Sequence, residues 1–79
     1  MMNITKREKD VLLFINSYIE DFNYSPCIRD ISDGLYLNST FSVQRHLEHL
    51  KQKGFLASGK VPRSFYITAE GYNIINDNK

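Results

Sequence analysis

The spacing of apolar residues begins with a run typical of one long amphipathic helix. Apolar residues that recur every three or four positions share one face of a helix. Thr5 and Glu8 have the spacing of a capping box, so the helix should begin after Thr5 and end near Phe22. Its buried stripe is expected to contain Val11, Leu12, Ile15, Tyr18, Ile19 and Phe22, widened by Leu13 and Phe14.

A second, shorter helix is expected from about Ile28 to Leu35. Pro26 disfavours a helical conformation in the residue before it, so the chain should be extended until the helix begins. Ile28, Ile31 and Leu35 fall on one face of this helix. Asp30 lies in its first turn, where a negative charge is favourable to the helix dipole.

A third helix is predicted at about residues 40–53. Ser39 is a suitable N-cap, and Gly54 can end the helix in the left-handed conformation that glycine tolerates. The helical spacing turns Val43, Leu47 and Leu50 toward the core. The opposite face is mostly polar and carries Phe41, Gln44, Arg45, Glu48 and Gln52.

The remaining residues predict a hairpin and a final short helix. The hairpin, at about residues 55–67, has strands at 55–57 and 64–67 and a turn that contains Gly59 and Pro62. Thr68 can cap the last helix, whose Tyr72 and Ile75 are available for packing. In this order, the elements predict a mainly α, single-domain winged helix-turn-helix over residues 1–79, with a three-helix core, a β-hairpin wing and a short C-terminal helix.

Composition limits the environment of the chain. Apolar residues make up 42% and charged residues 24%, a globular balance that leaves disorder only at the ends. Cys27 is the one cysteine, so an internal disulfide is excluded and a reducing compartment is favoured. The N-terminus lacks the pattern of a signal peptide, and the apolar run Val11–Ile15 is too short to span a bilayer. A cytoplasmic protein without membrane association is therefore expected.

The net charge of +1 conceals an uneven distribution. Residues 40–66 contain five basic side chains and one acidic side chain, a local charge of +4, whereas the rest of the chain has five basic and eight acidic ones, giving −3. Because the field of a protein acts locally, this asymmetry favours a binding face for a polyanion on the second half.

Several of these residues together resemble the DNA-binding domain of the LexA repressor family, from about Ile4 to Ile67. The resemblance is carried by Thr5-x-Arg7, Pro26, Ile31, Leu35, Ser39, His46-Leu47, Leu50 and Lys53-Gly54. It implies that the third helix enters the major groove and that its first turns touch bases. It also implies a bacterial or phage source. The self-cleaving serine–lysine domain of that family, which also dimerises, is absent from the sequence, so neither autocleavage nor that route to a dimer is expected.

Carried over to this chain, the resemblance implies DNA contacts by Ser39, Phe41, Ser42, Gln44 and Arg45. The last four depart from the family pattern, so the operator of that family is not assumed. Tyr36 stands where the family usually has glycine, so it must accept a left-handed backbone or shift the turn.

The chemistry of these side chains suits duplex DNA. Gln44 matches the adenine edge, and Arg45 suits guanine or a phosphate. Phe41 either meets a thymine methyl group or folds back over the turn. Near the helix N-terminus, Ser39 and Ser42 suit a phosphate. Further phosphate or minor-groove contacts are expected from the basic wing residues Lys60 and Arg63.

The residues do not suggest catalysis or a cofactor. A nucleophile elbow, a phosphate loop and clustered carboxylates are all missing. His46 and His49 are too few for a metal site, and His46 is expected to be structural. Cys27, near the start of the second helix, leaves open a redox role.

The sequence thus predicts a sequence-specific double-stranded DNA-binding protein, a transcriptional repressor or regulator and not an enzyme. Useful specificity favours a homodimer, for which the final helix, with Tyr72, Ile74 and Ile75, is the candidate surface. The alternative is a winged-helix module that binds another protein, such as a phage inhibitor of a host nucleic-acid enzyme.

Overall fold

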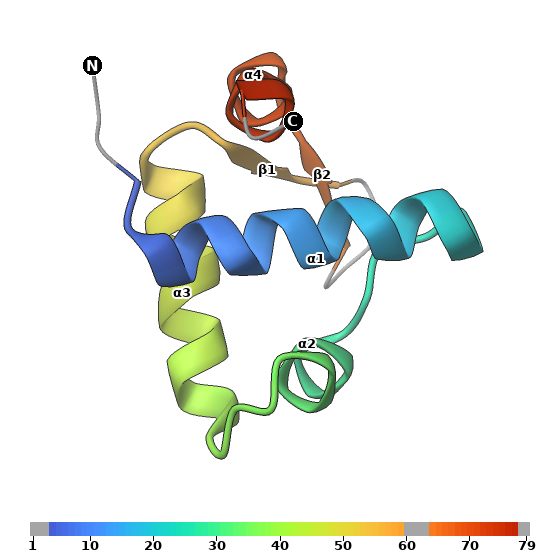
Figure 1. Ribbon diagram of the computed structural model, residues 1–79, viewed down its shortest axis with the longest axis vertical. Coiled ribbons are helices and arrows are strands. Elements are labelled where there is room, and N and C mark those ends of the chain that lie inside the picture. Colours follow the sequence, from blue (N-terminus) through green and yellow to red (C-terminus); the bar gives the residue numbers. More distant parts are fainter. Residues whose placement is uncertain (1–3, 60–63, 78–79) are drawn as a thin grey trace.

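Four helices and two strands are formed by residues 4–59 and 64–77, the part of the chain that the computed structural model describes. They follow the order α1 (Lys6–Phe22), α2 (Ile28–Gly34), α3 (Thr40–Gln52), β1 (Leu56–Ser58), β2 (Phe65–Ile67) and α4 (Ala69–Asp77). In Figure 1, α1 runs across the middle of the molecule, with α2 on one side and the hairpin and α4 on the other. The long helix packs against α2, α3 and α4. This arrangement confirms the predicted winged helix-turn-helix.

The ends of α1 and α4 follow local sequence signals. The Thr5 N–H donates to Glu8 Oε1 and the Glu8 N–H donates to Thr5 Oγ1, each at 3.1 Å, which confirms the capping box. Thr68 Oγ1 accepts a bond from the Gly71 N–H at 3.1 Å and donates to the carbonyl of Gly54. Thr68 therefore caps α4, as predicted, and also ties it to the residue that follows α3.

The two ends of α3 behave differently. Ser39 is the N-cap residue, but within the described part of the chain its side chain makes no capping hydrogen bond. At the other end, Gly54 has a φ of 85°, the left-handed conformation predicted for it. The helix thus ends where the glycine requires, while the first turn lacks the side-chain cap that Ser39 was expected to provide.

Every helix and strand contributes buried side chains to the core. Val43, Leu47 and Leu50 of α3 are buried, as their spacing predicted. The core also includes the buried side chains of Val11, Leu12, Ile15, Ile31, Phe55, Leu56, Phe65, Ile67 and Ile75. Among the described helices, none is long and apolar enough to cross a membrane.

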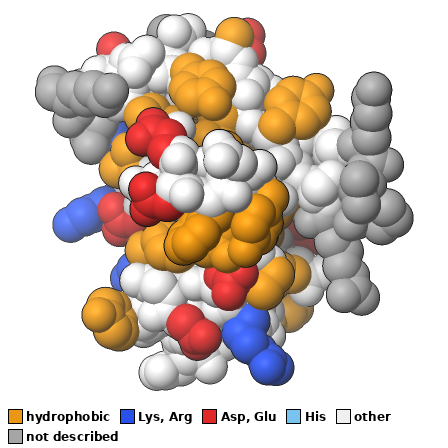
Figure 2. Space-filling view, turned by 90° about the vertical axis from the view of Figure 1, so that its right-hand side faces the viewer, with side chains coloured by type: hydrophobic (Ala, Val, Ile, Leu, Met, Phe, Trp, Pro, Cys, Tyr) orange, Lys and Arg blue, Asp and Glu red, His pale blue; other side chains and the backbone are white. Residues whose placement is uncertain are grey.

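The end of α1 corrects one prediction. Phe22, placed in the buried stripe, is 54% exposed, and Tyr18 and Ile19 are half-buried. The Tyr18 ring instead packs against Phe22 and Tyr24, with centroids 4.5 and 5.6 Å apart. Figure 2 looks onto the side where α1 ends, and hydrophobic side chains gather on the surface there. Phe22 has the helical spacing of the buried stripe, but it lies in the last turn of α1, at the edge of the core, and therefore stays exposed.

The hairpin is displaced by one residue from its predicted start. The strands pair antiparallel, with Leu56 opposite Ile67 and Ser58 opposite Phe65. Phe55 lies outside the strand because its backbone has other partners. Its N–H donates to the carbonyl of Leu50 at 2.9 Å, and its carbonyl accepts from the Thr68 N–H at 3.1 Å.

The turn between α2 and α3 accepts a left-handed residue. Tyr36 has a φ of 57°, so it keeps the conformation that glycine would adopt more easily. The turn is closed by Ser32, whose carbonyl accepts from the Leu37 N–H at 2.9 Å and whose hydroxyl donates to the Leu37 carbonyl at 2.7 Å. These bonds fix how α3 leaves the turn.

Candidate nucleic-acid interface

One long side of α3 is free of the core. Phe41 is 67% exposed, and Gln44 and Arg45 are also exposed. Ser39 is exposed just before the helix, and Ser42 is half-buried. The five residues therefore lie together on the first turns of α3 and before it, as the sequence predicted. Lys60 and Arg63, expected on the wing, lie outside the described residues.

The start of α3 is suited to an anion. The first N–H groups of a helix have no partner within the helix, and a negative charge there is favourable to the helix dipole. Because Ser39 does not cap them, these groups are available to a phosphate oxygen. Phe41 adds an apolar surface and Gln44 and Arg45 add hydrogen-bonding groups within the same stretch.

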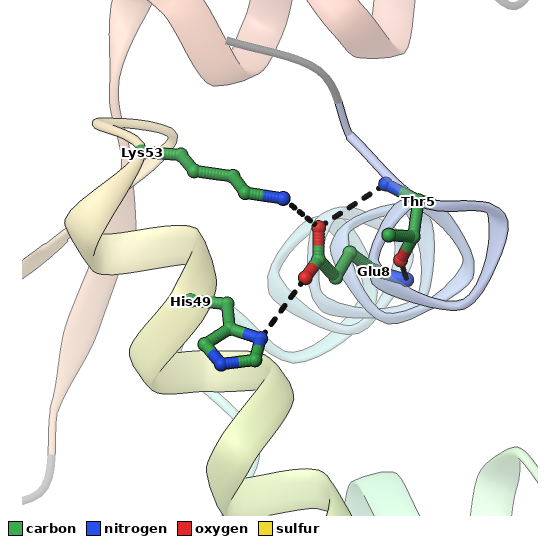
Figure 3. A network of polar contacts seen from close by, with 4 residues as sticks. All are labelled: Thr5, Glu8, His49 and Lys53. Carbon is green, nitrogen blue, oxygen red and sulfur yellow. Dashed lines mark hydrogen bonds and ion pairs between the residues drawn. The ribbon is translucent and has the colours of Figure 1, made fainter.

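The far end of α3 is held by a buried carboxylate on α1. Figure 3 shows Glu8 between the two helices, and its side chain is 3% exposed. Its Oε1 accepts from Lys53 Nζ at 2.6 Å, and its Oε2 lies 3.2 Å from His49 Nδ1. We call Glu8, His49 and Lys53, with the capping residue Thr5, the Glu8 cluster.

The Glu8 cluster changes the charge count made from the sequence. Lys53 was counted among the five cations of the second half, but its charge is paired with Glu8, so it does not add to a surface for a polyanion. The sequence pattern indicated only a capping role for Glu8. A pair separated by 45 residues carries no local spacing signal.

Burial lowers the pKa of His46, a histidine in the middle of α3. His46 is half-buried, and burial is the main reason that its pKa is lowered. The charges of His49, Arg7 and Arg45 lower the pKa of His46 further, while Glu8 opposes them. The half-buried position fits the structural role predicted for His46. Within residues 4–59 and 64–77, no group of three or more His, Cys, Asp or Glu side chains could hold a metal ion.

Acid should therefore weaken the fold in two stages. The neutral His46 of the fold has a pKa below 6.5, so the unfolded chain binds a proton first and stability falls below that pH. Burial raises the pKa of Glu8, but the bonds from Lys53, Thr5 and His49 outweigh it and lower the pKa below 4.5. Stability should fall again below pH 4.5 as the folded carboxylate is protonated.

The measurement is thermal unfolding followed by circular dichroism from pH 8 to pH 3. His46→Gln should remove the first stage and keep the second, while Glu8→Gln should keep the first and weaken the second, to which Asp30 also contributes because its pKa is lowered. A melting temperature that rises between pH 8 and pH 5 would contradict the assignment.

A polar link also joins α1 to the start of α2. Asp30 Oδ2 accepts from the Cys27 N–H at 3.1 Å and from Tyr18 Oη at 3.2 Å. The bond from the Cys27 backbone is the main reason that the pKa of Asp30 is lowered. Cys27 is exposed, and the redox role remains a hypothesis.

Comparison with known proteins identifies relatives of this arrangement. Residues 1–63 match the family model of the LexA DNA-binding domain. The chain is 44% identical over 61 residues to the LexA repressor of Anaeromyxobacter dehalogenans, covering 77% of this chain and 27% of that protein. It is 33% identical over 78 residues to the LexA repressor of Ligilactobacillus salivarius, covering 98% of this chain and 38% of that protein. The chain thus spans between about a quarter and two-fifths of these relatives.

A solved structure is similar over most of the fold. The crystal structure of a hypothetical protein from Sulfolobus solfataricus superposes with a TM-score of 0.79 at 27% identity. The match covers 94% of this chain and 54% of that one. The similarity therefore extends beyond residue 63 to the hairpin and α4.

Proposed function

The chain belongs to the LexA DNA-binding domain family, and from this we propose that it binds duplex DNA sequence-specifically as a transcriptional repressor. The observation that carries the proposal is the free side of α3, where Phe41, Gln44 and Arg45 are exposed opposite a buried apolar stripe. A surface helix can be polar without a ligand. Here the same helix is the one that enters DNA in the family.

The proposed mechanism places the start of α3 in the major groove. The groove is about 12 Å wide and admits a helix of about 10–12 Å diameter. Gln44 would pair with an adenine edge, Arg45 with guanine, and Phe41 with a thymine methyl group. Ser39 and Ser42 would bind phosphates, as would Lys60 and Arg63, which lie outside the described residues. A protein bound in this way at a promoter blocks polymerase.

The residues proposed to contact bases differ from the family pattern, so we propose that this chain recognises a DNA sequence different from the operator of that family. Because a single domain makes few base contacts, we further propose that two copies bind paired half-sites. Exposed Tyr72 and half-buried Ile74 on α4 are the candidates for the contact between copies, while Ile75 is buried in the core.

Selection of bound sequences from a random duplex pool tests the function directly. We expect an enriched motif, whose affinity falls steeply with salt because bound cations release counterions from the phosphates. Inverted repeats in the motif would support paired half-sites. The proposal fails if the protein does not bind duplex DNA even at low salt, and salt-insensitive binding to a protein would favour the alternative interaction module.

Arg45→Ala should weaken specific binding by about 1–3 kcal/mol and relax the preference at one base pair, because the guanidinium reads two acceptors on guanine. The measurement is titration of the selected site and of variants with one changed base pair. Arg45→Lys keeps the charge but cannot make a bidentate contact, so it should lose most of the preference for guanine at that base pair.

Gln52→Ala is the matched control for Arg45. Both residues are exposed on the polar side of α3, but Gln52 lies seven residues later, about 10 Å along the helix. It should bind DNA like the unaltered protein. Equal losses in the two alanine variants would contradict the placement of the reading surface at the start of α3.

A further inference from the structure

Tyr36 combines a strained backbone conformation with a side chain that is exposed to solvent. It lies in the turn between α2 and α3, with a φ of 57° and 91% of its surface exposed. A left-handed conformation is unfavourable for residues with a Cβ and is easily adopted by glycine. Backbone outliers that persist in a fold are often related to function. The question is therefore what the ring contributes.

The ring contributes nothing visible to the fold. Within residues 4–59 and 64–77, the Tyr36 side chain makes no hydrogen bond, ion pair or ring contact. Its backbone N–H donates to the carbonyl of Asp33 at 3.3 Å, a bond that any residue other than proline could make. The turn itself is closed by Ser32 and Leu37 on either side of Tyr36. Glycine would satisfy the same geometry with less strain.

The position of the ring points to the nucleic acid. Figure 1 shows the turn at the same end of the molecule as the start of α3, away from α4 and the hairpin. Tyr36 precedes the first residue of α3 by four positions, which can span at most about 14 Å. The major groove is about 12 Å wide and is bordered by the two sugar–phosphate backbones. With the start of α3 in the groove, the turn is close enough for the Tyr36 side chain to reach a phosphate at the groove edge.

We propose that Tyr36 is a DNA contact in which the phenol hydroxyl donates to a backbone phosphate beside the groove that holds α3. This inference rests on the proposed function. Tyrosine is one of the side chains that bind phosphates, and such contacts position a protein on the duplex without reading its sequence. Tyr36 therefore adds affinity for every sequence, whereas Gln44 and Arg45 add preference for one.

Two substitutions separate the ring from the fold. Tyr36→Gly removes the ring and relieves the strain, so this variant should melt at the same temperature or higher. It should nevertheless bind DNA roughly ten-fold more weakly, because it loses a charge-assisted hydrogen bond. Tyr36→Phe keeps the ring and lacks the hydroxyl, and should also bind roughly ten-fold more weakly, because it loses the same hydrogen bond. A variant that is more stable and yet binds less cannot owe its loss to unfolding.

The measurement is fluorescence anisotropy with the selected duplex and with a scrambled duplex of the same length. Both Tyr36 variants should lose the same factor on the two duplexes. Tyr24→Phe removes a hydroxyl from another exposed tyrosine, between α1 and α2, and serves as the matched control that should bind like the unaltered protein.

The outcomes distinguish the inference from the proposed function. If the unaltered protein binds neither duplex, the proposed function fails. If the unaltered protein binds and both Tyr36 variants bind equally well, the Tyr36 inference fails and the function stands. A loss confined to the selected duplex would show that Tyr36 reads bases, which overturns the phosphate assignment. A lower melting temperature for Tyr36→Gly would overturn the argument from strain.

Discussion

Replacing Glu8 with alanine should lower the free energy of unfolding by about 3–4 kcal/mol. The carboxylate is buried and accepts bonds from Lys53 at 2.6 Å and from the Thr5 N–H at 3.1 Å. Its loss leaves the Lys53 ammonium, 21% exposed, without its counter-charge and removes half of the capping box. Removing one partner of a buried pair costs about 3–5 kcal/mol. We take the lower end, since Lys53 can turn toward water.

Thermal and urea unfolding measure the effect. In a domain of this size, about 3 kcal/mol corresponds to a fall of roughly 12–24 °C in the melting temperature. Glu48→Ala removes an exposed glutamate from α3 and should change stability by no more than about 0.5 kcal/mol. Equal melting temperatures for the two alanine variants would refute the role of the Glu8 cluster.

Two further variants separate the cap from the ion pair. Glu8→Gln keeps a side chain that can complete a capping box, so it should be less damaging than Glu8→Ala. Lys53→Met leaves the buried carboxylate without its main partner. Combining Glu8→Gln with Lys53→Met should recover part of the loss of Lys53→Met, because no unpaired charge is left buried.

Gly71→Ala should lower the free energy of unfolding by about 2 kcal/mol. Gly71 is buried in the first turns of α4, and an added Cβ would lie 2.4 Å from the carbonyl oxygen of Phe55 and 2.7 Å from Ile67 Cγ2. The Phe55 carbonyl cannot move aside, because it accepts the bond from the Thr68 N–H at 3.1 Å. Helix α4 must therefore move outward, which uncovers Ile75. This cost exceeds the gain of about 1 kcal/mol that alanine brings to a helix.

Asn73→Ala is the matched control on the same helix. Asn73 is exposed, so alanine there should leave stability unchanged or raise it slightly. Urea unfolding of the two variants compares the same new residue at a packed and an open position of α4. A Gly71→Ala protein as stable as the unaltered one would show that α4 is not held closely against the hairpin.

Most of the fold could be predicted from residues that lie close together in the sequence. The bonds between Thr5 and Glu8, and the left-handed Gly54 after α3, depend on residues a few positions apart, so their spacing in the sequence was enough. The buried stripe of α3 followed from its helical period in the same way. The exposure of Phe22 and the backbone partners of Phe55 depend on where other elements end, which no local pattern records.

In the candidate site, too, the features set by local helical spacing were predictable, and those set by distant residues were not. Once Val43, Leu47 and Leu50 are assigned to the core, helical geometry places Phe41, Gln44 and Arg45 on the opposite side. The pairing of Lys53 with Glu8 was not predictable, because the two residues are far apart in sequence. The DNA contacts assigned to individual residues remain predictions, and those of Lys60 and Arg63 concern residues outside the described ranges.

The Glu8 cluster holds α3 at its last turn, while Phe41, Gln44 and Arg45, the residues proposed to read bases, lie in its first turns. The contacts that attach the helix and the side chains proposed for base recognition therefore lie at opposite ends of α3. Substitutions at positions 41, 44 and 45 should therefore change the preferred bases without weakening the contacts that orient the helix. A scaffold divided in this way lends itself to retargeting by exchange of a few exposed side chains.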